Sequence, residues 1–213
     1  MTTMNLKMWR RVGGLWLAAG LTALFAARTD AQTPAAAAPA AEMDALLSGR
    51  DLLNQGRWTE AIRFFRAALK AAPESSEARF GLATALTQIE RFTEAVPLLE
   101  TLLREFPDNP AVLNNLAWVL AKSDDPGLRD PPRALRLARN AVLAGPADFN
   151  IWNTLAEAYL ANQQPARALR AVRVAIGLAH ADGGVRDTTQ MENLMRRCAK
   201  AAGELVEAPN VHE

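Results

Sequence analysis

The sequence is short of the residues from which most catalytic and metal sites are built. Its 213 residues include one cysteine, Cys198, and two histidines, His180 and His212, which lie far apart along the chain. A single cysteine excludes a disulfide within the chain and a metal site made of cysteines. Paired histidine motifs, phosphate-binding glycine loops and nucleophile elbows are also missing. We therefore expect no cofactor, no metal and no enzymatic activity.

Aromatic residues and net charge are scarce as well. Phe, Trp and Tyr make up 6% of the chain, and the formal net charge is +1. So small a charge gives no general attraction to nucleic acid, and we expect no nucleic-acid partner. The chain is 50% hydrophobic, with Ala and Leu predominant. Because these residues favour helices, whereas strands prefer β-branched and aromatic residues, the composition predicts an all-α fold with a sizeable core.

The first forty residues have the layout of an export segment followed by a linker. A basic start precedes the uncharged run 12–27, and small residues lead to a candidate cleavage point after Ala31. This run is shorter than the roughly 20 residues of a membrane-spanning helix. We therefore interpret residues 1–31 as a signal peptide, with an uncleaved N-terminal anchor as the alternative, and residues 32–41 as a Pro/Ala-rich linker. The protein is then periplasmic or secreted, or anchored in the inner membrane.

The remaining sequence repeats itself. The stretch RWTEA at residues 57–61 recurs 34 residues later as RFTEA at residues 91–95. Pro73 and Pro107 share this spacing, and Pro146 follows after 39 residues because the third unit has a longer loop. Small residues recur where two helices must approach closely, and large apolar residues recur three and four apart, which gives each helix one buried stripe.

Four units carry the same pattern. The matching positions are Gly49, Leu52, Ala61, Phe65 and Ala68 in the first unit, Ala83, Leu86, Ala95, Leu99 and Leu102 in the second, Ala117, Leu120, Ala134, Ala138 and Ala141 in the third, and Trp152, Ala156, Tyr159, Ala168, Val172 and Ala175 in the fourth. The pattern resembles the tetratricopeptide repeat (TPR) family. This resemblance implies a right-handed α-solenoid of four helix hairpins, at residues 42–75, 76–109, 110–148 and 149–180.

The last hairpin of such a solenoid needs a cap, because each repeat buries its apolar stripe against a neighbour. Residues 187–205 show apolar residues at helical spacing, and they predict a C-terminal capping helix. Cys198 lies in this stripe and is expected to be a buried apolar residue rather than a partner for another chain. The tail 206–213 is expected to be disordered.

The starts of several helices are indicated by capping residues. Thr59 and Thr93, each just before a Glu-Ala pair, are expected to be N-caps of second helices. Asp130 is expected to have the same role before Pro131, since proline fits the first helical position.

The resemblance also implies a concave groove, lined by the first helix of each pair, that binds a peptide or a partner protein. The inward positions are Arg50, Phe80, Thr84, Asn114, Asn115, Trp118, Asn150, Asn153 and Glu157. A carboxamide can both donate to and accept from a peptide backbone, and aromatic residues are common at interface hot spots. For Asn115 the alternative is a bond to a neighbouring helix, and for Trp118 it is packing against the next helix pair.

Rows of basic residues run along the second helices, on the expected convex side. They are Arg63, Arg66 and Lys70, then Arg133, Arg136 and Arg139, then Arg167, Arg170 and Arg173. A solvated face is one interpretation, and contact with anionic lipid or an acidic partner is the other. Glu94 and Glu100 interrupt the pattern in the second unit.

We therefore expect a non-catalytic, protein-binding scaffold or adaptor of the bacterial cell envelope, with a protein or peptide in its groove. The alternatives are a self-associating structural module and a membrane-anchored accessory protein of an envelope assembly system. The sequence leaves open the partner, the oligomeric state and which of the two faces binds.

Overall fold

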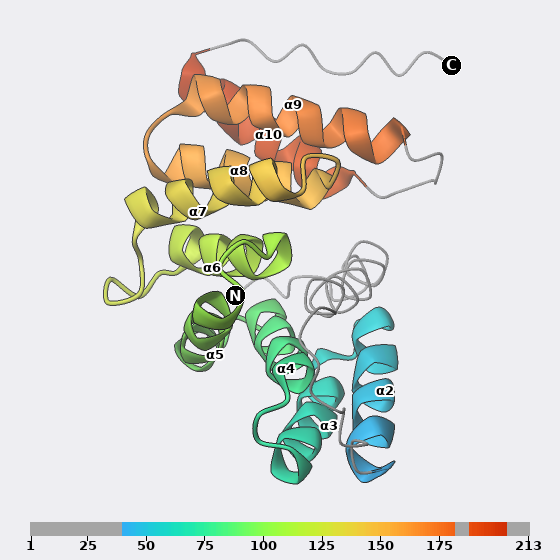
Figure 1. The fold of residues 1–213 in the computed structure, drawn as a ribbon. Helices are drawn as coiled ribbons and strands as arrows, with labels where there is room; N and C mark the ends of the chain where they lie inside the picture. The colour runs from blue at the N-terminus through green and yellow to red at the C-terminus, as the bar shows by residue number, and fades with distance from the viewer. Residues whose placement is uncertain (1–39, 182–187, 204–213) are drawn as a thin grey trace, which may run out of the picture.

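The computed structural model describes residues 40–181 and 188–203, and within them the chain is helical with no strand. The helices are α2 (Ala40–Asn54), α3 (Trp58–Ala71), α4 (Ser76–Gln88), α5 (Phe92–Glu105), α6 (Pro110–Lys122), α7 (Pro131–Ala144), α8 (Phe149–Ala161), α9 (Pro165–Ala181) and α10 (Thr189–Ala202). The all-α fold is as predicted (Figure 1). The expected signal peptide, nearly all of the linker and the tail lie outside the described residues.

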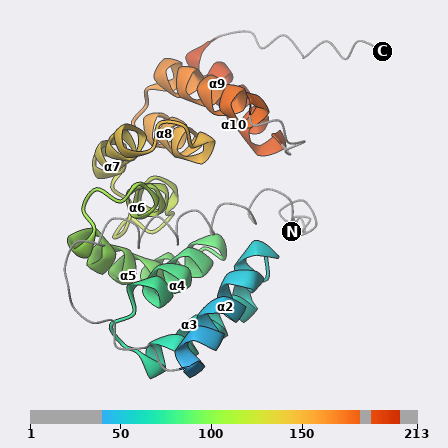
Figure 2. The same ribbon diagram turned by 45° about the vertical axis from the view of Figure 1, so that its right-hand side comes forward.

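The helices form four pairs and a final single helix, stacked into an arc (Figures 1 and 2). The first helices α2, α4, α6 and α8 lie toward the inner side of this arc, together with α10, and the second helices α3, α5, α7 and α9 lie toward the outer side (Figure 2). Each helix packs on the next one in sequence, and α4, α6 and α8 also contact the first helix of the preceding pair. In the parts of the chain described, no helix has the length and apolar character needed to cross a membrane.

The core is built from the small and large residues that recur in the sequence. Fully buried alanines occupy equivalent positions of all four second helices and of three first helices, where they allow the backbones to approach closely. These are Ala61, Ala95, Ala134 and Ala168, and then Ala83, Ala117 and Ala156. Large side chains fill the remaining space, and Phe65, Leu99 and Val172 are fully buried. Most of the predicted stripe residues therefore belong to one core along the solenoid, and Leu102 lies in a smaller cluster with Phe80 and Val112.

Two glycines make room for the ring of Phe65 at the first junction between pairs. A Cβ atom added at Gly81 on α4 would lie 2.3 Å from Cε1 and Cζ of Phe65, and one added at Gly49 on α2 would lie 3.0 Å from the same atoms. Phe65 itself is 0% exposed. Glycine is therefore required at position 81 because the phenylalanine ring fills the space that any side chain would need.

The predicted N-cap is confirmed at Asp130 but not at Thr59 and Thr93. Asp130 caps α7, since its carboxylate accepts a hydrogen bond of 3.0 Å from the backbone N–H of Arg133. The predictions for Thr59 and Thr93 were wrong. The helices α3 and α5 begin one residue before them, at Trp58 and Phe92, so the threonines lie inside the first turn.

The physical reason is that these helices are started by other residues. Trp58 and Phe92 pack against the core and are thereby drawn into the helix. The N-cap positions belong to Arg57 and Arg91, whose side chains pair with acidic residues of the first turn. A carboxylate at a helix N-terminus is favourable, which compensates for the lack of a side-chain cap.

The helix α10 packs on α9 and α8 and closes the C-terminal end of the solenoid, as predicted. Its apolar stripe is buried, with Met191, Leu194 and Cys198 each less than 5% exposed. Burial raises the pKa of the Cys198 thiol to about 11, and the nearby Glu157 carboxylate adds to the effect. The thiol is therefore neutral at physiological pH and behaves as a small apolar side chain, because the thiolate is the reactive form.

Candidate partner-binding face

Two carboxamides occupy equivalent positions on the inner helices of the third and fourth pairs. Asn114 lies on α6 and Asn153 lies on α8, and both residues are half-buried. The side-chain oxygen of each is buried, and no hydrogen-bond donor reaches it from the described residues. A buried acceptor without a partner costs roughly 1–3 kcal/mol. At the equivalent positions of the first two pairs the chain has Leu46 and Phe80, which are apolar and buried.

Trp118 lies one turn after Asn114 on the same helix. Its ring is half-buried, and the ammonium group of Lys122 lies 5.5 Å from the ring centroid. This distance is in the range of a cation–π interaction, which orients the ring and the lysine together. Asn150, one turn before Asn153, is tied to the start of α8 because its Nδ2 donates to Oδ1 of Asp148 at 3.4 Å.

Glu157 is engaged by other parts of the chain. It is 7% exposed, and Arg197 of α10 donates two hydrogen bonds to its carboxylate, at 2.9 and 3.4 Å. Lys122 of α6 lies 3.6 Å from the same carboxylate. The buried charge is thus compensated from both neighbouring helices, as a buried carboxylate requires. Glu157 therefore joins α6, α8 and α10 and holds Lys122 beside Trp118.

Asn115 and Thr84 bond to each other across two inner helices. The Asn115 side chain donates a 3.1 Å hydrogen bond to Oγ1 of Thr84, which itself donates to the backbone oxygen of Phe80 at 2.8 Å. Thr84 is 2% exposed. The structure thus shows the alternative interpretation of Asn115, a bond to the neighbouring helix α4.

The remaining candidates lie in the first two pairs. Phe80 is 1% exposed and packs with Leu102 and Val112, so it belongs to the core. Arg50 is partly exposed and lies 4.0 Å from the carboxylate of Glu77. Burial raises the pKa of Glu77, and Arg50 opposes this shift. The structure thus places Asn114 and Trp118 on α6 and Asn150 and Asn153 on the adjacent helix α8, and Lys122 and Glu157 link the two helices.

A family model for the tetratricopeptide repeat matches residues 46–110, 88–126 and 127–183. The chain belongs to the tetratricopeptide repeat family. The TPR fold indicates a scaffold for protein–protein interaction, and members of the family are typically non-catalytic.

Solved structures with the same fold include several bacterial TPR proteins. The thermophilic TPR protein TTC0263 of Thermus thermophilus has 20% identity and a TM-score of 0.62, with 76% of this chain and 83% of that chain covered. MamA of Desulfovibrio magneticus has 18% identity and a TM-score of 0.56, with 78% and 94% covered. YrrB, described as a TPR protein with an unusual peptide-binding site, has 18% identity and a TM-score of 0.52, with 67% and 75% covered. A search of curated proteins finds no match.

Within this TPR scaffold, two basic residues of the inner face, Lys122 and Arg197, were not predicted from the sequence. Lys122 could have been found, because it follows Trp118 by four residues and residues four apart share one side of a helix. Arg197 could not have been found, because its partner Glu157 is 40 residues away in sequence. The described residues hold no group of three or more His, Cys, Asp or Glu side chains placed to bind a metal ion. The chemistry available on this face is hydrogen bonding, stacking and charge pairing.

Proposed function

We propose that the concave face of α6 and α8 binds an extended segment of a partner protein. The observation that carries the proposal is the pair of carboxamides at Asn114 and Asn153. Neither side chain makes a hydrogen bond to the described part of the chain. The side-chain N–H groups, unlike the buried oxygens, are left for an external acceptor. An extended peptide supplies backbone carbonyls as acceptors whatever its sequence.

The spacing of the two amides suits an extended chain. Packed helices have axes roughly 8–10 Å apart, and an extended chain advances about 3.3 Å per residue. Asn114 and Asn153 would therefore reach carbonyls about three residues apart. Trp118, beside Asn114, offers a ring on which an apolar or aromatic side chain of the segment can pack. YrrB has the same fold and is described as having a peptide-binding site, which supports this proposal.

A crosslinking experiment tests where the partner lies. A photoreactive phenylalanine analogue in place of Trp118 should form a covalent product with the partner in the native host. The same analogue in place of Phe64, a 39% exposed residue of the outer helix α3, should form none. Crosslinking from position 64 alone would contradict the proposal. A product made of two copies of this chain would favour the self-associating module instead.

We further propose that the protein acts in the bacterial cell envelope as an exported adaptor. The support is the sequence of residues 1–31, with its basic start, its uncharged run and its small residues before position 32. We expect the protein isolated from its host to lack residues 1–31, which intact-mass measurement would show directly. A protein with the mass of the full chain in the membrane fraction would favour the anchored accessory protein. A protein of that mass in the cytosol would contradict export.

A further inference from the structure

The outer helices are joined by ion pairs that follow a regular register. Arg66 of α3 donates a 3.0 Å hydrogen bond to Glu94 of α5, 28 residues later. Glu100 of α5 then accepts two bonds, of 2.5 and 2.8 Å, from Arg133 of α7. That separation is 33 residues because the third unit has five extra residues before α7. The two acidic residues that interrupt the basic rows are therefore the partners of those rows.

At the third junction the same register has arginine at both positions. Arg139 of α7 has the position of Arg66 and Glu100, and Arg167 of α9, 28 residues later, has the position of Glu94 and Arg133. Arg139 makes no ion pair or hydrogen bond to the described part of the chain, and Arg167 bonds to the neutral side chain of Gln164 at 2.9 Å. Like charges at a position that elsewhere holds a complementary pair are unfavourable.

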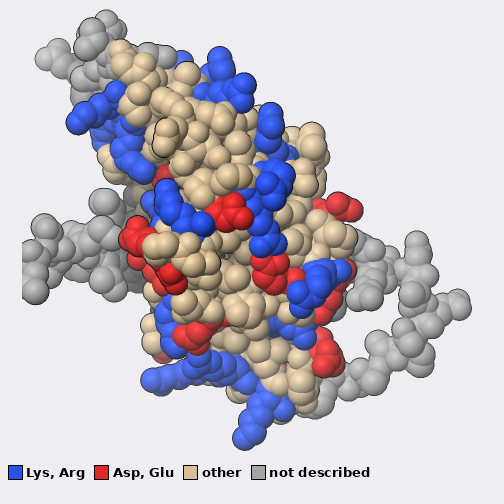
Figure 3. Space-filling model, turned by 90° about the vertical axis from the view of Figure 1, so that its left-hand side faces the viewer, with Lys and Arg blue, Asp and Glu red and all other residues tan. Residues whose placement is uncertain are grey.

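The two helices add positive charge and contain no acidic residue of their own. The helices α7 and α9 each contain three arginines and no Asp or Glu. Arg136 and Arg170, one turn after Arg133 and Arg167, are exposed and also without a partner among the described residues. Figure 3 shows this outer face, where basic side chains predominate in the upper part and both signs occur further down. Four arginines, at positions 136, 139, 167 and 170, thus form a convex arginine cluster.

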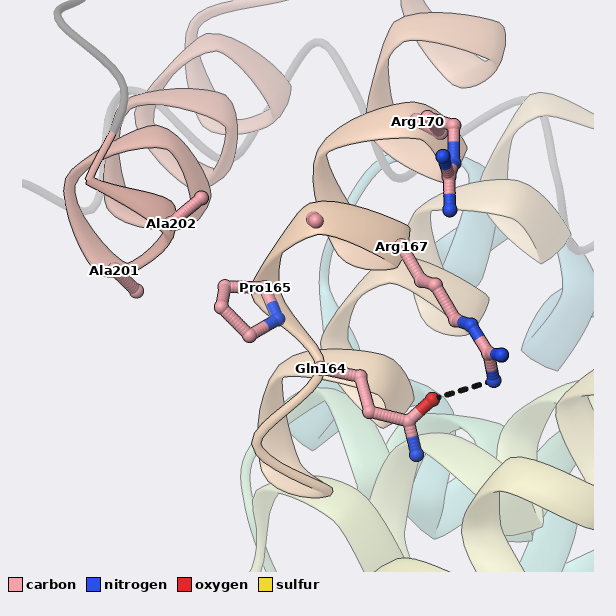
Figure 4. Close-up of a pocket in the computed structure, with 7 residues that line it drawn as sticks. Gln164, Pro165, Arg167, Arg170, Ala201 and Ala202 are labelled. Atoms are coloured by element: carbon pink, nitrogen blue, oxygen red, sulfur yellow. Dashed lines mark hydrogen bonds between the residues drawn. The ribbon is translucent and has the colours of Figure 1, made fainter.

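An open hollow borders the cluster on the α10 side of α9. Its volume is about 520 Å³, and it is lined by Gln164, by Arg167 and Arg170 of α9, and by the small side chains of Pro165, Ala166, Ala201 and Ala202. Figure 4 shows Pro165 facing Ala201 and Ala202 of α10, whereas the side chains of Arg167 and Arg170 extend from α9 toward the opposite side.

We propose that the convex arginine cluster at the α7–α9 junction is a second interaction surface, which binds acidic side chains of a partner protein. The partner supplies the carboxylate that the register lacks between Arg139 and Arg167. Both of the completed junctions use a carboxylate presented by a helix, and the site therefore fits Glu or Asp on a helical segment. Lipid phosphate suits the surface less well, because a convex arc meets a flat bilayer over a small area (Figure 2).

The decisive variant is Arg139→Glu. It supplies the missing carboxylate within the chain, so it should raise the melting temperature by roughly 1–3 °C through a pair with Arg167. It should at the same time weaken the binding of an acidic peptide by about tenfold, since the cluster loses half of its positive charge and the new carboxylate competes with the peptide for Arg167. The probe is a fluorescein-labelled peptide with glutamates three residues apart, and binding is measured by anisotropy on the purified full chain.

Two controls and one alternative ligand make the outcome unambiguous. Lys70→Glu makes the same change of charge on the exposed side of α3 and should leave the affinity within about twofold, because the site is remote. The same peptide with glutamine in place of glutamate should not bind. Equal losses of affinity in Arg139→Glu and Lys70→Glu, or an unchanged affinity in Arg139→Glu, would overturn the proposal. A lowered melting temperature of Arg139→Glu would show that positions 139 and 167 do not form a pair. Binding to phosphatidylserine vesicles without binding to the peptide would assign the surface to lipid instead.

Discussion

Replacing Gly81 with alanine should destabilise the protein by about 2 kcal/mol, although alanine is the better helix former by roughly 1 kcal/mol. The new Cβ would lie 2.3 Å from the ring of Phe65, which real contacts do not permit. Phe65 is 0% exposed and its ring also lies against Gly49 on α2, so a shift of the ring would disturb the packing of the first junction between pairs. Urea unfolding followed by circular dichroism measures the change in the free energy of unfolding.

A matched control is available in the same chain. Gly177 lies in α9, and a Cβ added there meets no atom within 4 Å, so Gly177→Ala should stabilise the protein by up to about 1 kcal/mol. Adding Phe65→Leu to Gly81→Ala should recover part of the loss, because the smaller side chain frees space for the methyl group. If Gly81→Ala were as stable as Gly177→Ala, the packing described for the first junction would be wrong.

The sequence predicts the helix pairs well because the residue spacing that produces them is local and recurs in every unit. The small residue that begins each buried stripe, such as Ala61 or Ala95, recurs at a fixed spacing, and a helix of fixed pitch turns that spacing into one face. The exact helix starts were harder to predict. Thr59 and Thr93 are good N-caps by residue type, but the packing of Trp58 and Phe92 on the core decides where those helices begin.

The candidate site was predictable only in part. The register of the repeats is sufficient to place Asn114, Trp118 and Asn153 together on the inner face. It cannot show that Glu157 is bonded to Arg197 of the capping helix, because this contact depends on how the solenoid ends. The register also could not predict why Glu94 and Glu100 interrupt the basic rows of the outer helices. The reason is visible only in the structure, where these two residues bond to Arg66 and Arg133.

Replacing both Asn114 and Asn153 with leucine should make the protein more stable and a poorer binder. The change removes two buried oxygens that have no donor in the described residues, and Leu46 shows that leucine is accepted at this position of the repeat. We expect a gain of about 1 kcal/mol in the free energy of unfolding for each site. A variant that is more stable cannot lose binding by unfolding, so the two effects separate a binding role from a structural one.

The expected loss of binding follows from the hydrogen bonds that the two amides would make. Two hydrogen bonds of about 1 kcal/mol each correspond to a loss of affinity of roughly 30-fold. The control is Asn140→Leu, which makes the same replacement at an exposed residue of the outer helix α7 and should leave the affinity unchanged.

The most direct test is the dissociation constant of the partner segment, identified by crosslinking from position 118, for the Asn114→Leu/Asn153→Leu variant and for the unaltered protein. We predict a dissociation constant about 30-fold higher for the double variant and an unchanged one for Asn140→Leu. Equal dissociation constants for the double variant and the unaltered protein would show that the inner face of α6 and α8 does not bind the partner through its carboxamides.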